Sequence, residues 1–130
     1  MMEYIVKIND FDGPLDLLLH LIKESNIEIC DIKIEEITNQ YLEYIHKMEE
    51  LNLNIASEYL LMASELIEMK SKYLIPSKKE EIEEEEEDPR ERLIEKLIEY
   101  DYYKKVCKSF EVMEQKRKEI HTKEPSMGKE

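Results

Sequence analysis

The side chains that could do chemistry are few and widely spaced. Cys30 and Cys107 stand alone, with no CxxC pair and no histidine at metal-ligand spacing, so we expect two reduced thiols. His20 lies in an apolar run and is expected at the edge of a core. Asp16 and Glu65 fall in or near apolar helices, where an edge-of-core carboxylate is far commoner than a catalytic one.

Motifs that build catalytic or metal sites are missing from the sequence. It has no glycine-rich phosphate loop, no paired His–Glu metal motif and no Gly-x-Ser-x-Gly turn. The many glutamates fall on the polar faces of expected helices, where they are solvated. We therefore expect no enzymatic activity, no metal and no cofactor.

The residues that could bind a partner gather in residues 54–76, which read as one long helix with Asn54 as its N-cap and with two apolar seams. The first seam consists of Ile55, Tyr59, Met62, Leu66, Met69 and Tyr73. The second consists of Ala56, Leu60, Ala63, Ile67 and Leu74, about 100° around the helix. A surface helix needs one apolar stripe, so two seams predict one neighbour inside the fold and one from another chain.

Side-chain size assigns a provisional role to each seam. Ala56 and Ala63 permit close helix approach, so we predict that the second seam packs against the preceding helices. The first seam combines tyrosine and methionine with aliphatic residues, which is typical of adaptable interfaces, so we predict that it binds the partner. An alternative stays open, in which both seams are covered within the chain.

Composition predicts an all-α chain built as a small helical bundle. Charged residues make up 39% of the 130 residues, and only two are glycine. The net charge of −13 divides into −9 over residues 1–76, −6 over 77–88 and +2 over 89–130. Because DNA is densely negative, we expect any DNA role to be indirect. No apolar run is long enough for a membrane span, so we expect a soluble, cytoplasmic protein.

The elements before the long helix are two shorter helices and an N-terminal arm. Residues 3–8 alternate in polarity and could form a short strand or extended arm. Asp12-Gly13-Pro14 predicts a helix start, and Ser25-Asn26 its end. A second helix is expected from about Ile34 to Glu50.

The chain after the long helix begins with a like-charge block. Residues 77–88 read as a solvated acidic linker. Asp88 then fits a helix N-cap and Pro89 a first helical position, for a helix running to about Ile120. We therefore expect three parts: a helical domain over 1–76, a linker over 77–88 and a separate helical segment over 89–130.

Four segments in this order resemble the ScpA family, the kleisin subunit of the bacterial SMC (structural maintenance of chromosomes) complex. They are FDGPLDLLLHLI, DIKIEEITNQYLEYI, LMASELIEMKSKYLIP and DPRERLIEKLIEYDYYKK. Lys33 stands where the family carries a proline. The resemblance covers residues 4–76 and continues through the last of these segments.

The resemblance implies a non-catalytic subunit that serves chromosome condensation and segregation at the nucleoid. Its helical domain would bind the coiled-coil neck of an SMC protein, and we place that contact on the first seam. The segment after the linker would bind an ScpB dimer through Leu93, Leu97, Tyr100, Tyr103 and Phe110. DNA would be held only through the complex. No winged-helix pattern occurs before Glu130, so we expect an N-terminal fragment.

A second hypothesis does not need the resemblance. The chain could be a free-standing helical adaptor or regulator that self-associates through its spare seam.

Overall fold

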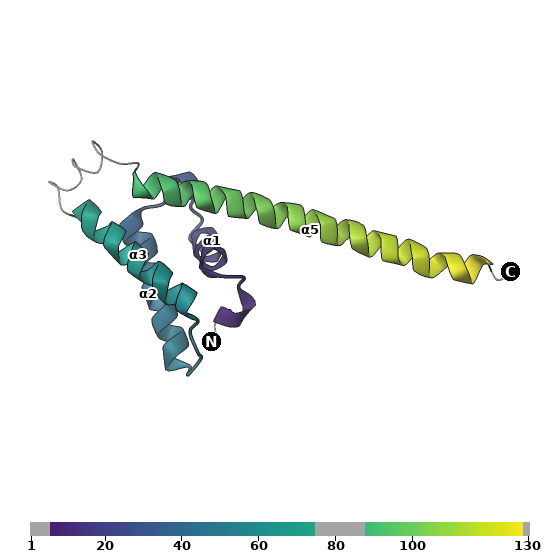
Figure 1. Cartoon of the computed structure of the whole chain (residues 1–130), viewed down its shortest axis with the longest axis horizontal. Helices are drawn as coiled ribbons and strands as arrows, with labels where there is room; N and C mark the ends of the chain where they lie inside the picture. Colours follow the sequence, from purple (N-terminus) through teal and green to yellow (C-terminus); the bar gives the residue numbers. More distant parts are fainter. Residues whose placement is uncertain (1–5, 75–87, 129–130) are drawn as a thin grey trace. The chain divides into compact units, whose positions relative to one another are not determined.

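Helices account for nearly all of the structure, a computed structural model that describes residues 6–74 and 88–128, with side chains as far as residue 120. Four α-helices follow one another in the described ranges (Figure 1): α1 (Pro14–Glu24), α2 (Ile34–Glu50), α3 (Ser57–Leu74) and α5 (Pro89–Gly128). Two 3₁₀ turns, η1 (Ile8–Asp10) and η2 (Ile29–Asp31), precede α1 and α2. The predicted all-α class is confirmed.

Two predictions concern residues that the structure describes only in part. The possible strand over residues 3–8 lies partly outside the described residues, and its described part, 6–8, is not a strand and leads into η1. The acidic segment expected over 77–88 lies outside the described residues except for Asp88.

The chain divides into two compact units, Met1–Ile98 and Glu99–Glu130. The division falls inside α5, so the first turns of this helix belong to the same unit as α1, α2 and α3. We had expected the boundary in the segment 77–88. The functional assignment of the three expected ranges stays a prediction.

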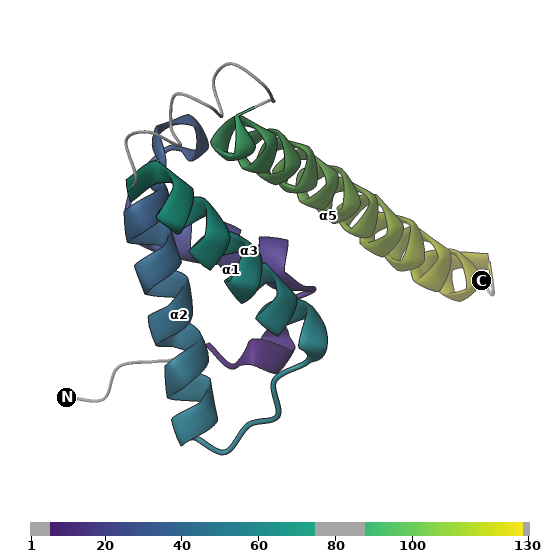
Figure 2. The same ribbon diagram turned by 60° about the vertical axis from the view of Figure 1, so that its left-hand side comes forward.

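The core of the first unit lies among α1, α2 and α3. Helix α2 packs against both α1 and α3, and α1 also touches α3 (Figure 2). Fully buried side chains come from all three helices, as expected for one apolar core. They include Leu17, Leu18, Leu19, Tyr41, Met48 and Leu66.

Local chemistry explains where α1 begins. Gly13 has φ 120°, a conformation that L side chains rarely adopt, and Pro14 follows at the first helical position. The Asp12 backbone N–H donates to Asp16 Oδ2 at 2.9 Å. Asp16 is buried, and its carboxylate thus holds the entry to the helix as predicted for an edge-of-core acid.

Asparagine, in place of glycine, ends α1 and α2. Asn26 has φ 56° and Asn52 has φ 60°, both in the left-handed region. At each end the backbone makes the paired hydrogen bonds of a Schellman motif, such as Asn52 N–H to Glu49 O at 2.9 Å and Leu53 N–H to Met48 O at 3.1 Å. The predicted end of α1 is confirmed.

Helix α3 begins at Ser57, three residues after the predicted N-cap Asn54. The amide of Leu53 is still bonded to α2, so the chain leaves that helix late. Ile55 and Ala56 therefore precede α3 instead of opening it.

Candidate interaction surfaces

The buried side of α3 carries the centre of the seam that we predicted to bind a partner. Tyr59, Met62 and Leu66 are buried in the first unit, and Leu66 is 0% exposed. The other three members of the seam are half-buried: Ile55, Met69 and Tyr73. The partner role of the six residues stays a prediction, to which the structure adds that three of them belong to the core.

Tyrosine hydroxyls fasten this side of α3 to the rest of the unit. The Tyr41 hydroxyl donates to the carbonyl oxygen of Tyr59 at 2.8 Å. The Tyr59 hydroxyl lies 3.4 Å from the carbonyl oxygens of Ile8 and Phe11. Burial is the main cause that raises the pKa of both tyrosines, so both hydroxyls remain protonated donors.

The second seam lies mostly on the exposed side of α3, and the prediction that it packs against the preceding helices is wrong. Leu60, Ile67 and Leu74 are 50%, 49% and 57% exposed. Ala56 is also exposed, and only Ala63 is buried. The larger side chains of the first seam bury more apolar area than those of the second seam would. The Tyr59 hydroxyl also reaches backbone carbonyls, so the first seam fills the core.

We define the α3 stripe as Leu60, Ile67 and Leu74. These residues recur every seven positions, so they fall on nearly the same side of the helix. Small side chains recur at the same interval beside the α3 stripe. They are Ser57, Ser64 and Ser71. An apolar row with heptad spacing and small neighbours suits a second helix packed at close range.

Two neighbouring residues mark the limits of the α3 stripe. Lys70 donates from Nζ to Asn39 Oδ1 of α2 at 2.8 Å, so it is held toward the first unit. Leu61 is 62% exposed but lies about 100° around the helix from Leu60, outside the stripe.

The first turns of α5 pack within the first unit. Leu93 and Leu97, both predicted to bind ScpB, are 3% and 0% exposed there, and Ile94 beside them is buried. The predicted N-cap of this helix is confirmed, because the Arg90 N–H donates to Asp88 Oδ1 at 3.1 Å.

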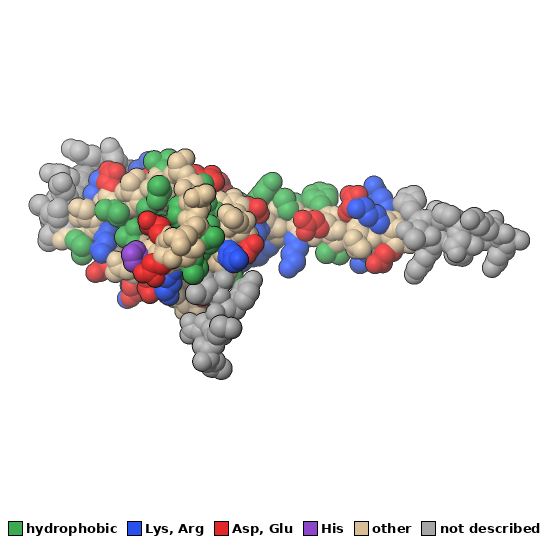
Figure 3. All heavy atoms as spheres, turned by 90° about the horizontal axis from the view of Figure 1, so that it is seen from below, with side chains coloured by type: hydrophobic (Ala, Val, Ile, Leu, Met, Phe, Trp, Pro, Cys, Tyr) green, Lys and Arg blue, Asp and Glu red, His purple; other side chains and the backbone are tan. Residues whose placement is uncertain are grey.

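The second unit exposes a run of apolar residues along α5. Counted at 100° per residue, six of them fall within an arc of about 100°, which we define as the α5 face. They are Tyr102, Tyr103, Val106, Phe110, Met113 and Ile120. All but the half-buried Val106 are exposed, and Figure 3 shows apolar side chains between acidic and basic ones along this helix.

The five residues predicted to bind ScpB therefore divide between the two units. Tyr103 and Phe110 lie on the α5 face and are exposed. Tyr100 is half-buried, with its ring centroid 6.2 Å from that of Tyr103. Leu93 and Leu97 lie in the first unit, outside this arc. The ScpB role of all five stays a prediction.

The cysteine and histidine side chains that could do chemistry do not form a common site in the described ranges. Cys30 is exposed and Cys107 is half-buried, and both are free thiols. His20 forms an ion pair with Glu24 when protonated. Among the described residues, no group of three His, Cys, Asp or Glu side chains could hold a metal ion. No described helix is both long and apolar enough to cross a membrane.

An all-α core with two exposed apolar helix faces is typical of helical proteins that bind other proteins. Residues 21–130 match the family model described as segregation and condensation protein ScpA. The chain belongs to this family, as the four sequence segments predicted.

Curated relatives are similar in sequence to this chain along nearly its whole length. It is 55% identical to segregation and condensation protein A of Bacillus subtilis and 54% identical to that of Bacillus velezensis, in each case over 97% of this chain and 52% of the relative. The protein of the same name from Halalkalibacterium halodurans is 49% identical over 96% of this chain and 50% of the relative. The chain spans about half the length of the curated relatives it matches.

Sequence reasoning missed two features of these surfaces. The seven-residue spacing of the α3 stripe and its serines was visible in the sequence and could have marked a helix-packing face. Arg90 gave no such signal, because its main partners are backbone carbonyls about sixty residues earlier in the chain.

Proposed function

We propose that the chain acts as a non-catalytic kleisin subunit in chromosome condensation and segregation, as a cytoplasmic part of an SMC complex at the nucleoid. Membership of the ScpA family supports this role, since the family's description names segregation and condensation. In this proposal the first unit binds the coiled-coil neck of an SMC protein, and α5 recruits an ScpB dimer. The net charge of −13 supports a contact with DNA that is only indirect.

The observation that carries the proposal is the exposed α3 stripe. Its apolar side chains project from a helix whose opposite side is fixed in a core, and among the described residues they remain about half exposed. A coiled-coil neck offers helices with the same heptad spacing. We therefore move the proposed centre of the neck contact from the first seam to the α3 stripe.

The α5 face supports the second part of the proposal. Aromatic and methionine side chains are enriched where proteins bind partners, and this face contains Tyr102, Tyr103, Phe110 and Met113. Among the residues first predicted for ScpB, Tyr103 and Phe110 keep that role in the proposal. Leu93 and Leu97 are engaged inside the first unit.

A binding experiment with paired variants tests both contacts at once. Leu60→Glu should weaken binding to an SMC neck fragment by about thirtyfold, corresponding to ~2 kcal/mol for a central anchor, and leave ScpB binding unchanged. Phe110→Glu should do the reverse. Leu61→Glu and Val112→Glu place the same charge on exposed apolar positions outside the two faces and should bind both partners normally. Isothermal titration calorimetry measures each affinity.

Three outcomes contradict the proposal. Equal affinities for Leu60→Glu and Leu61→Glu would remove the α3 stripe as the neck contact. Equal affinities for Phe110→Glu and Val112→Glu would do the same for the α5 face. A dimer of the chain that light scattering finds unchanged in the presence of the neck fragment would favour the self-associating adaptor instead.

A further inference from the structure

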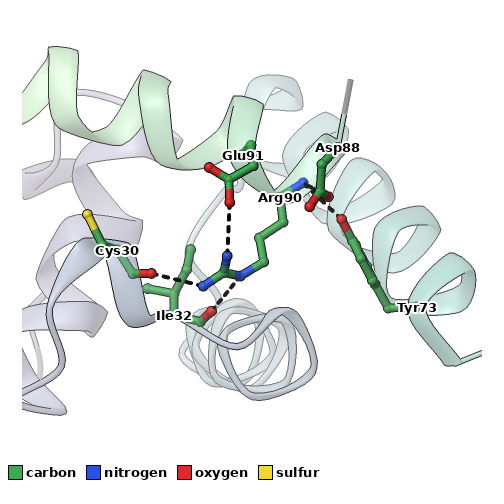
Figure 4. A network of polar contacts seen from close by, with 6 residues as sticks. All are labelled: Cys30, Ile32, Tyr73, Asp88, Arg90 and Glu91. Carbon is green, nitrogen blue, oxygen red and sulfur yellow. Dashed lines mark hydrogen bonds and ion pairs between the residues drawn. The ribbon is translucent and has the colours of Figure 1, made fainter. Parts of the chain in front are cut away.

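Arg90 joins the start of α5 to a distant turn of the first unit. Its Nε donates to the carbonyl oxygen of Ile32 at 2.9 Å, and its Nη2 donates to that of Cys30 at 2.9 Å (Figure 4). These carbonyls flank the end of η2. The third guanidinium nitrogen, Nη1, lies 3.3 Å from Glu91 Oε1, so the neighbouring acid holds the fork in orientation.

The backbone at Arg90 is bound as well as its side chain. Its N–H is shared between Asp88 Oδ1 at 3.1 Å and the hydroxyl of Tyr73, at the end of α3, at 3.2 Å. Arg90 therefore contacts η2 through its side chain and α3 through its main chain. All of these groups belong to the first unit.

The turns that follow Arg90 lie along one flank of α3. Pro89 and Leu93 line a crevice of about 250 Å³ together with Met62 and Met69 of α3. Met62 is buried and Met69 half-buried. Without this neighbour, Met62 and Met69 would be more exposed on this side of α3, which we call the methionine flank. It also carries charged residues and is separate from the α3 stripe.

We propose that Arg90 is a positioning residue that docks the first turns of α5 against α3 and η2 within the first unit. Docking covers the methionine flank of α3 and leaves the α3 stripe as its open apolar face. Arg90 thereby helps to determine which side of α3 a partner helix can reach. The docking itself does not depend on the identity of that partner, so it can be tested apart from the proposed function.

A planar guanidinium suits this task better than an ammonium. It sends two N–H groups from a rigid fork toward two carbonyls on either side of one residue, whereas lysine is a single flexible point charge. Arg90→Lys should therefore dock α5 less well than the native chain and better than Arg90→Ala.

The methionines of the chain report on docking. Peroxide oxidises methionine side chains according to their exposure, and mass spectrometry resolves each site. In Arg90→Ala, Met62 and Met69 should oxidise about tenfold faster. This factor corresponds to the loss of about one charge-assisted hydrogen bond from the docked state. Met48, 0% exposed in the core, should stay protected, and Met113, 63% exposed, should react equally in all variants.

Arg117→Ala is the matched control, because it removes the same charged group from an exposed position of α5 in the second unit, away from the crevice. It should leave the rates at Met62 and Met69 within about twofold of the native chain, as expected for a surface substitution. Unchanged rates at both methionines in Arg90→Ala would overturn the proposal. An equal rise at Met48 would also overturn it, because Arg90 would then be needed for the fold of the whole unit.

Discussion

At the residue scale, tyrosine hydroxyls connect parts of the first unit that are far apart in the sequence. Tyr41 bonds to α3, Tyr59 lies near two carbonyls around η1, and Tyr44 donates to the carbonyl oxygen of Val6. Burial is the largest cause that raises the pKa of all three tyrosines above the ordinary value of 10.0. These hydroxyls stabilise the fold only while they hold their protons.

The raised pKa values predict that the free energy of unfolding falls at alkaline pH. The folded state keeps the tyrosine protons above pH 10, where the unfolded chain releases them, so stability is complete below that pH and declines as pH rises. Tyr41→Phe should cost about 1 kcal/mol at pH 8, the value of one hydrogen bond. The difference from the native chain should shrink above pH 10, measured by urea unfolding.

Tyr102→Phe provides the control for this pH dependence, because Tyr102 is 69% exposed in the second unit. Its unfolding free energy should follow that of the native chain at every pH. The unfolding free energies of Tyr41→Phe and of the native chain are compared from pH 8 to about pH 11, beyond the ordinary tyrosine pKa. A constant difference across this range would contradict the stabilising role of the protonated Tyr41 hydroxyl.

Periodicity alone could not rank the two seams at this scale. It placed Tyr59 and Leu60 on different sides of one helix correctly, but both sides were apolar. Which seam is buried depends on hydrogen bonds from tyrosine hydroxyls to carbonyls such as Ile8 O, and these partners have no sequence pattern. The alanines of the second seam suggested close packing, yet only Ala63 became buried.

At the element scale, the end of α1 was easier to predict than the start of α3. The end of α1 at Ser25-Asn26 followed from residue type, since asparagine tolerates the left-handed conformation. Asn54 looked equally suitable as an N-cap for α3, but after the backbone bond from Leu53 that closes α2, the next helix begins only at Ser57.

Asn52 should be sensitive to a side chain that disfavours positive φ. Asn52→Ala should lower the free energy of unfolding by about 1 kcal/mol, whereas Asn52→Gly should be neutral or slightly stabilising. Asn54→Ala, an exposed position just before α3, should change stability by less than about 0.5 kcal/mol. Urea unfolding measures all three, and equal losses in the two alanine variants would contradict the role of Asn52.

At the scale of the whole molecule, sequence order was more informative than sequence periodicity. Four segments in one order predicted the ScpA family, and the family match over residues 21–130 confirms it. The composition predicted the all-α class correctly. The packing of Leu93 and Leu97 inside the first unit was not predictable, because the bonds found beside it, from Arg90 to a turn near Ile32, join distant parts of the sequence.

The central claim is that the α3 stripe faces the SMC neck, and site-specific cross-linking tests it most directly. A photoreactive phenylalanine derivative placed at Ile67 should cross-link to a neck fragment in the assembled complex. The same group at Leu61, which is exposed on a different side of α3, should not. Efficient cross-linking from position 61 with none from position 67 would contradict the account.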